Sequence, residues 1–108
     1  MSLYVLSHPW EVKEVENGIR VTLTPRDLDV QTVSILIDEL FELALESDRP
    51  NLYLDFSKVS LLTSVMIGKL FALNRRLQDV GGRLVLCNLG PALQEIVWAV
   101  SWPDERPA

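Results

Sequence analysis

The spacing of apolar residues divides the chain into strand-like and helix-like segments. Short apolar or partly alternating runs predict strands, and apolar positions three or four residues apart predict helices. By these patterns, strands are expected at residues 10–15, 19–24, 51–56 and 83–87, and helices at 30–46, 64–80 and from 91 onward. The near-continuous apolar character of 51–56 predicts a strand that is buried on both faces.

Turn and cap residues separate these segments. Asn17-Gly18 predicts a hairpin turn between the first two strands, because both residue types tolerate positive φ. Gly81-Gly82 follows the second helix with the residue type that tolerates a left-handed backbone. Pro91 begins the third helix, at a position where its missing N–H costs nothing. A loose tail is expected from Trp102 to Ala108, and its main part is about 103–108.

The order of the segments is strand, strand, helix, strand, helix, strand, helix. Strands that alternate with helices predict an α/β fold, in which a partly parallel sheet has helices packed against it. A length of 108 residues is that of one domain. We therefore expect a single domain over residues 1–108, with a mixed sheet of four or five strands.

Composition and charge exclude several classes of function. A net charge of -5 argues against a general nucleic-acid-binding protein, because neutralising phosphates needs a basic surface. The one cysteine, Cys87, excludes an internal disulfide and a multi-thiolate zinc site, and its strand-like surroundings predict a small buried hydrophobic residue. The one histidine, His8, removes most catalytic and metal-binding constellations, so no metal or cofactor is expected. There is neither a run of about 18 apolar residues nor a signal-like start, so a cytoplasmic protein is expected.

Residues for catalysis do not come together in the sequence. No glycine-rich phosphate loop precedes a helix, since Gly81-Gly82 follows one. Ser64 has no G-x-S-x-G context and no histidine base, which argues against a hydrolase triad. A reaction at Cys87 is the remaining enzymatic alternative, and the prediction is that the protein is not an enzyme.

The first predicted helix carries a row of like charges. Asp38, Glu42 and Glu46 follow one another at four-residue spacing, and no basic residue lies between Asp27 and Asp48. Such a row is mildly unfavourable in an isolated helix. Two interpretations stay open, a solvated face and an acidic docking surface.

The second predicted helix has an apolar stripe and an opposite face of mostly smaller residues. The stripe consists of Met66, Leu70, Leu73 and Leu77, and the opposite side consists of Ser64, Val65, Gly68, Ala72 and Arg75. Gly68 costs the helix about 1 kcal/mol relative to alanine. Either another molecule's backbone approaches closely there, or the glycine packs against a neighbouring element of the same chain, and spacing alone favours neither.

Thr63 and Ser64 lie where the strand and its loop pass into this helix. Capping alone explains two hydroxyls at a helix start, but the same position suits a regulatory site. A phosphoryl group on Ser64 would add about -1.5 to -2 charges at pH 7. It would lie at the positive end of the helix, where free N–H groups receive it. It would repel a partner that packs an apolar or acidic patch there, without unfolding the domain.

Three segments together resemble the STAS domain family, which contains the bacterial anti-sigma factor antagonists. They are Asn51-Leu52-Tyr53-Leu54-Asp55-Phe56-Ser57-Lys58-Val59, Leu62-Thr63-Ser64-Val65-Met66-Ile67-Gly68 and Gly81-Gly82-Arg83-Leu84-Val85-Leu86-Cys87-Asn88-Leu89. The family pattern is a strand ending in Asp, a loop, Asp-Ser-Ser/Thr-Gly-Leu/Ile-Gly, a helix, Gly-Gly and a strand. Asp27-Leu28-Asp29 resembles the family's acidic-Leu-Asp before the first helix, so the resemblance covers nearly the whole chain.

The resemblance implies a module that binds an anti-sigma factor, itself a serine kinase of the histidine-kinase-like ATPase type. The kinase would phosphorylate Ser64, which matches the first serine of the motif, and so release the module. A metal-dependent serine phosphatase would restore it. Gly68 matches the motif's second glycine, and Asp29 matches an aspartate near the site in relatives. Together with the outward face of the helix, the expected partner-binding residues are Asp29, Thr63, Ser64, Val65, Gly68, Ala72 and Arg75.

Three motif positions differ from the family pattern. Thr63 stands in place of the aspartate, Val65 in place of the second hydroxyl, and Met66 in place of the first glycine. A Thr-Ser pair also occurs in family members outside the simple switch, including stressosome scaffolds and a lipid-transport accessory subunit. Ser64 is thus the expected phosphorylation site, with Thr63 a weaker candidate. The alternative is a scaffold or accessory subunit of a larger assembly, without a phosphorylation cycle.

Overall fold

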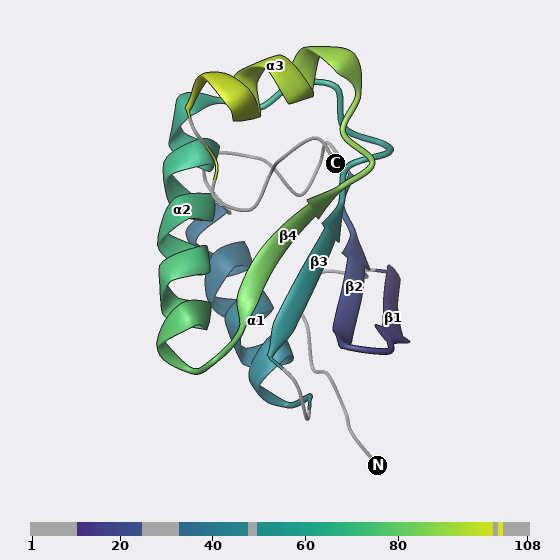
Figure 1. Ribbon diagram of the computed structural model, residues 1–108, viewed down its shortest axis with the longest axis vertical. Helices are drawn as coiled ribbons and strands as arrows, with labels where there is room; N and C mark the ends of the chain where they lie inside the picture. The colour runs from purple at the N-terminus through teal and green to yellow at the C-terminus, as the bar shows by residue number, and fades with distance from the viewer. Residues whose placement is uncertain (1–10, 25–32, 48–49, 101, 103–108) are drawn as a thin grey trace.

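Strands and helices form in the predicted order in the part of the chain that the structure describes. The computed structural model describes residues 11–24, 33–47, 50–100 and 102 (Figure 1). The strands are β1 (Glu11–Val15), β2 (Gly18–Thr22), β3 (Asn51–Asp55) and β4 (Arg83–Cys87), and the helices are α1 (Val33–Leu45), α2 (Ser64–Asp79) and α3 (Pro91–Ala99). These bounds agree with the expected ones to within a few residues.

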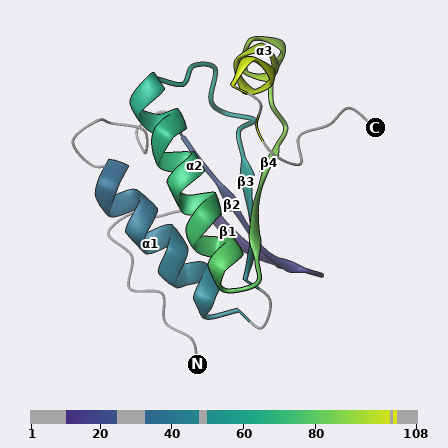
Figure 2. The ribbon, with the colours of Figure 1, turned by 60° about the vertical axis from the view of Figure 1, so that its left-hand side comes forward.

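The sheet has the strand order β1-β2-β3-β4. β1 is antiparallel to β2, and the pairs β2–β3 and β3–β4 are parallel. Each parallel strand is added on the same side of the one before it, so crossovers of one hand place α1 and α2 on the same face. Figure 2 shows both helices on one side of the sheet. The predicted α/β fold with a mixed sheet is confirmed.

One face of the sheet forms the core with these helices. Six residues, each at most 4% exposed, make two rows across the parallel strands: Ile19, Leu52 and Leu84, then Val21, Leu54 and Leu86. Between them, Arg20, Tyr53 and Val85 are only half-buried. The prediction that 51–56 is buried on both faces is therefore wrong. Both helical crossovers lie on one side, and alternate side chains of a strand face away from them.

The same alternation decides the environment of Cys87 at the end of β4. Cys87 is the register neighbour of Asp55 on β3 and is half-buried, outside the core cluster. The expectation of a small buried hydrophobic residue is wrong at this position. Leu84 and Leu86 face the helices, so Cys87, one residue further, faces the other side.

The hairpin between β1 and β2 is confirmed, but for a different reason than positive φ. Val15 pairs with Gly18, and neither Asn17 nor Gly18 has a positive φ. A Cβ at Gly18 would overlap the carbonyl oxygen of Asn51 on the neighbouring strand β3. The Asn51 side chain also donates a hydrogen bond to the Asn17 carbonyl at 2.8 Å. The glycine is needed because β3 approaches the backbone closely.

The end of α2 and the start of α3 follow the expected cap chemistry. Trp102, in contrast, is not part of a loose tail as expected. Gly81 has φ 87° after α2, and Pro91 occupies the first turn of α3. Trp102 is 6% exposed, donates its backbone N–H to the Val97 carbonyl at 3.1 Å, and packs on Phe71 with ring centroids 4.8 Å apart. The Trp102 ring therefore packs against α2 after the end of α3. Residues 103–108 lie outside the described residues.

Part of the acidic row on α1 is used within the protein. Asp38 accepts a hydrogen bond at 2.9 Å from Arg76 of α2. The Arg76 guanidinium also lies 4.1 Å from the ring centroid of Phe41 on α1. Asp38 therefore joins the two helices, while Glu42 is exposed to solvent. A solvated face and a docking surface both stay open as interpretations of the other two carboxylates of the row, Glu42 and Glu46.

Candidate functional site

The candidate site lies at the carboxyl end of β3, where the chain passes through residues 56–63 into α2. In sheets of this kind, the loops beyond the carboxyl ends of parallel strands are the usual place for binding. β3 ends at Asp55, a charged residue that is only 8% exposed. A buried charge at this position needs partners, and they come from three parts of the chain.

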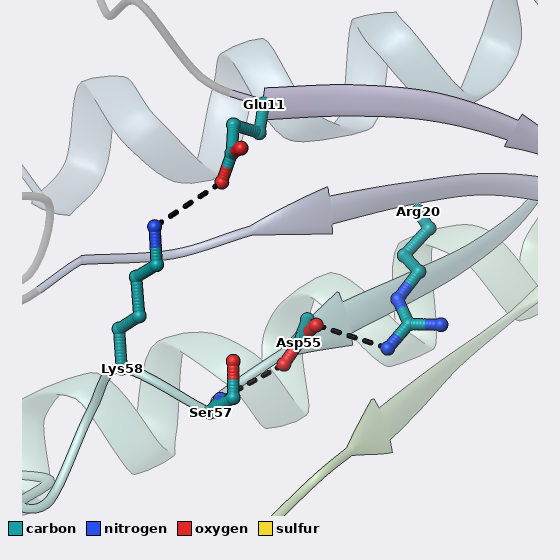
Figure 3. Close-up of polar contacts among 5 residues, drawn as sticks. All are labelled: Glu11, Arg20, Asp55, Ser57 and Lys58. Atoms are coloured by element: carbon teal, nitrogen blue, oxygen red, sulfur yellow. Dashed lines mark hydrogen bonds and ion pairs between the residues drawn. The ribbon is translucent and has the colours of Figure 1, made fainter.

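Figure 3 shows Asp55 accepting hydrogen bonds from β2 and from the loop that follows β3. Arg20 of β2 donates to one carboxylate oxygen at 2.9 Å, and the Ser57 N–H donates to the other at 2.8 Å. Burial raises the pKa of Asp55. Hydrogen bonds from the Ser57 N–H, the Asn88 side chain, the Ser57 hydroxyl and Arg20 lower it by more, so the pKa falls from 3.8 to about 2. Asp55 is therefore ionised at neutral pH.

These hydrogen bonds join the middle of β2 to the ends of β3 and β4. Arg20 belongs to β2, Ser57 begins the loop after β3, and Asn88 follows β4 with a left-handed backbone at φ 56°. A second contact, from Lys58 to Glu11 of β1, measures 3.3 Å and is exposed, so it contributes little. Asp55 therefore determines how the β3–α2 loop leaves the sheet.

Two apolar anchors hold the rest of this loop. Val59 and Leu62 are each 6% exposed, and the Val59 N–H donates to the Phe56 carbonyl at 3.0 Å. Leu61, between the anchors and the helix, is turned outward and is 71% exposed. The sequence does not reveal Leu61 as an exposed residue of the site, because an isolated leucine beside a buried one has no periodic signal.

Thr63 is the N-cap of α2. Its backbone is extended, with φ -84° and ψ 161°, and its hydroxyl oxygen accepts a hydrogen bond from the Met66 N–H at 3.2 Å. Ser64 is the first helical residue, and its side chain is exposed and makes no hydrogen bond within the described residues. The first turn of α2 contains no acidic residue. The two hydroxyls therefore differ: the Thr63 hydroxyl caps the helix, and the Ser64 hydroxyl bonds to no described residue.

The expected division of α2 into two faces is confirmed. Met66, Leu70, Leu73 and Leu77 are at most 1% exposed and pack into the core. The structure brings most of the predicted site residues together on the outward side, where all are exposed: Thr63, Ser64, Val65, Gly68, Ala72 and Arg75. Asp29 lies outside the described residues. The geometry thus forms one continuous helix face, which we call the α2 outward face (Ser64, Val65, Gly68, Ala72 and Arg75).

Gly68 has no packing partner within the described chain. A Cβ built at this position meets no atom within 4 Å. By contrast, a Cβ at Gly82 would overlap the carbonyl oxygen of Pro50, so that glycine is explained by the fold. No described residue explains Gly68, in the second turn of α2, in this way.

Two kinds of feature are absent from the described residues. In these ranges no group of His, Cys, Asp and Glu side chains is arranged to hold a metal ion. No described helix is both long enough and apolar enough to cross a membrane.

Comparison with known proteins gives one family and several similar structures, of which two follow. The model of the STAS domain family matches residues 10–102. The NMR structure of the protein TM1081 superimposes with a TM-score of 0.75 at 15% identity, over 86% of this chain and 74% of that chain. The anti-sigma factor antagonist SpoIIAA in its unphosphorylated form gives 0.68 at 18% identity, over 84% and 79%. At these identities the likeness shows the fold alone. A search of curated proteins gave no match.

The first prediction concerns the carboxylate of Asp55. Because the folded-state pKa lies below its ordinary value, Asp55 stabilises the fold above about pH 4, and this stability is lost as the pH falls from about 4 to about 2. Asp55→Asn should lower the free energy of unfolding at pH 7 by about 2 kcal/mol and flatten its dependence on pH in that window. Urea unfolding between pH 2 and 7 measures both.

Asp38→Asn is the matched control for this experiment, because Asp38 makes an ion pair of the same length that is exposed. Its loss should change the free energy of unfolding by less than about 1 kcal/mol. An Asp55→Asn variant as stable as Asp38→Asn would show that Asp55 does not hold the strand ends together.

The second prediction concerns the N-cap. Thr63→Ala removes the acceptor for the Met66 N–H and should destabilise the protein by about 1 kcal/mol, whereas Thr63→Ser should be close to neutral. Thermal unfolding followed by circular dichroism compares the three proteins. Equal stability of the alanine and serine variants would refute the capping role.

Proposed function

The chain belongs to the STAS domain family, and we propose on this basis that it is a regulatory binding module of the anti-sigma factor antagonist type. It binds a serine-kinase anti-sigma factor through the α2 outward face, and phosphorylation of Ser64 releases it. A serine phosphatase reverses the modification. The module acts in the cytoplasm, by binding rather than by catalysis.

The observation that carries this proposal is the unoccupied space above Gly68. A glycine within a helix costs about 1 kcal/mol relative to alanine, and no described residue approaches a Cβ built there within 4 Å. The alternative of a packing glycine within the same chain therefore has no supporting neighbour among the described residues. Close approach by another molecule remains as the physical reason, and it supports a docking surface on α2.

The difference between Thr63 and Ser64 supports Ser64 as the regulated residue. The Thr63 hydroxyl is engaged with the Met66 N–H, so modification there acts on the helix cap itself. Modification of the free Ser64 hydroxyl leaves that cap in place. The added charge lies at the positive end of α2, so the fold tolerates it while an apolar or acidic partner surface is repelled.

The second candidate function is a scaffold or accessory subunit that uses the same surface without phosphorylation. Thr63 favours it, because threonine replaces the acidic residue of the switch motif and the resulting Thr-Ser pair also occurs in family members outside the simple switch. The two functions differ in the free protein. A switch module is small when unbound, whereas a scaffold assembles, and size-exclusion chromatography with light scattering separates them.

The third prediction is phosphorylation at Ser64. Incubation with ATP and the serine-kinase anti-sigma factor encoded beside its gene should add one phosphoryl group, which mass spectrometry should map to Ser64. Ser64→Asp should retain the circular dichroism spectrum of the fold and bind that kinase at least about tenfold more weakly, a loss of about 1.4 kcal/mol. Binding of the kinase without modification of either Ser64 or Thr63 would reject the switch and leave the scaffold function.

The fourth prediction separates stability from binding at Gly68. Gly68→Ala should raise the free energy of unfolding by up to about 1 kcal/mol, because the new methyl group meets no described residue of the free protein. Gly68→Leu should leave the fold intact and abolish kinase binding by steric overlap. Ser34→Leu, on the exposed side of α1, is the control for added bulk. Unchanged binding of Gly68→Leu would remove the docking surface from this face.

A further inference from the structure

Two exposed apolar side chains flank Ser64. Leu61 is 71% exposed and Val65 is 48% exposed, although their neighbours Leu62 and Met66 are buried. The loop that carries Leu61 is anchored at Val59 and Leu62, so the exposure of Leu61 follows from the fold rather than from a lack of restraint. One end of the α2 outward face is therefore apolar.

The other end of this face is cationic. Arg75 is exposed and makes no ion pair with any described residue, whereas the next residue, Arg76, is engaged with Asp38 and Phe41 of α1. Lys69, beside the face, also makes no ion pair within the described ranges. The only acidic residue of α2 is the exposed Asp79, one turn beyond Arg75 at the last position of the helix. A protein with a net charge of -5 thus presents, on one helix, positive charge that pairs with no described carboxylate.

Helix geometry connects the two ends into one strip. Ser64 and Arg75 are eleven residues apart, which is about 16 Å along the axis. They point in nearly the same direction, because 100° per residue brings position i+11 within about 20° of position i. Gly68 and Ala72 lie between them on one side of the strip, and the half-buried ring of Phe71, which packs on Trp102, lies between them on the other. About three turns of another helix match its length.

We propose that the occupant of this strip is an acidic amphipathic helix of the partner, a proposal that rests on the function proposed above. Its apolar end contacts Leu61 and Val65, and its carboxylates pair with Arg75 and Lys69. Arg75 then provides charge complementarity, and the two apolar residues provide most of the buried hydrophobic area. Phosphorylation of Ser64 releases this helix because the new charge lies at the apolar end, where contact would remove it from water.

The test uses the full chain and the purified kinase of the phosphorylation experiment, with affinity measured by calorimetry at about 50 and about 300 mM NaCl. Wild-type affinity should fall as salt rises, because salt screens exposed charge pairs. Arg75→Glu should weaken binding about tenfold or more at low salt and lose most of this salt dependence. Lys13→Glu makes the same charge change on β1, away from α2, and should bind within about twofold of wild type.

A zero-length carboxyl–amine crosslinker should join Lys69 to an Asp or Glu of a helical segment in the kinase. Exchanging that acidic residue for lysine should restore binding to Arg75→Glu. Leu61→Ser tests the apolar end, with Ile35→Ser on α1, another exposed apolar position at 53%, as its control. Only Leu61→Ser should weaken binding.

Each contrary outcome has a distinct meaning. If Arg75→Glu binds like wild type while Gly68→Leu does not bind, the docking surface stands and the acidic occupant is wrong. If the wild type does not bind the kinase, both the proposed function and this inference fail. If the chain alone forms a dimer that Arg75→Glu disrupts, the occupant is a second copy, and the inference is overturned.

Discussion

The ionised carboxylate of Asp55 is the interaction on which the arrangement of the candidate site depends. It lies at the end of β3. Burial there raises the pKa of Asp55, and hydrogen bonds lower this pKa by more. Its partners come from β2, from the loop after β3 and from the residue after β4. One buried group therefore links β2 to the ends of β3 and β4, and the loop leading to Ser64 starts from a defined direction.

From this loop onward, α2 divides stability and recognition between its two faces. Four residues at most 1% exposed fasten the helix to the sheet, and Asn74 adds a buried hydrogen bond of 2.9 Å to the Leu84 N–H. That bond also occupies a backbone donor of β4, the last strand in the sheet. Because the inward face is so well held, the outward face can carry an unfavourable residue such as Gly68 without loss of the helix.

The sequence predicts features that depend on local periodicity and fails where distant segments meet. The two faces of α2 and the end of the helix at Gly81 follow from spacing and cap chemistry alone. The Arg20 contact of Asp55 joins residues 35 apart, so no local pattern reveals it. Gly18 is misread for the same reason, because its neighbour is Asn51 rather than its own turn. The one-sided burial of β3 depends on where both helices pack.

Threonine stands at position 63, where the family motif has aspartate, and this difference affects both the helix cap and the local charge. Threonine and aspartate are both good N-cap residues, and the Thr63 hydroxyl performs this role, so the helix start does not need the acid. Residues 57–63 and the first turn of α2 contain no carboxylate. Among the described residues 57–67, a phosphoryl group on Ser64 would then be the only negative charge at this end of the α2 outward face. The surface would change from apolar to strongly anionic, a larger contrast than an adjacent aspartate would allow.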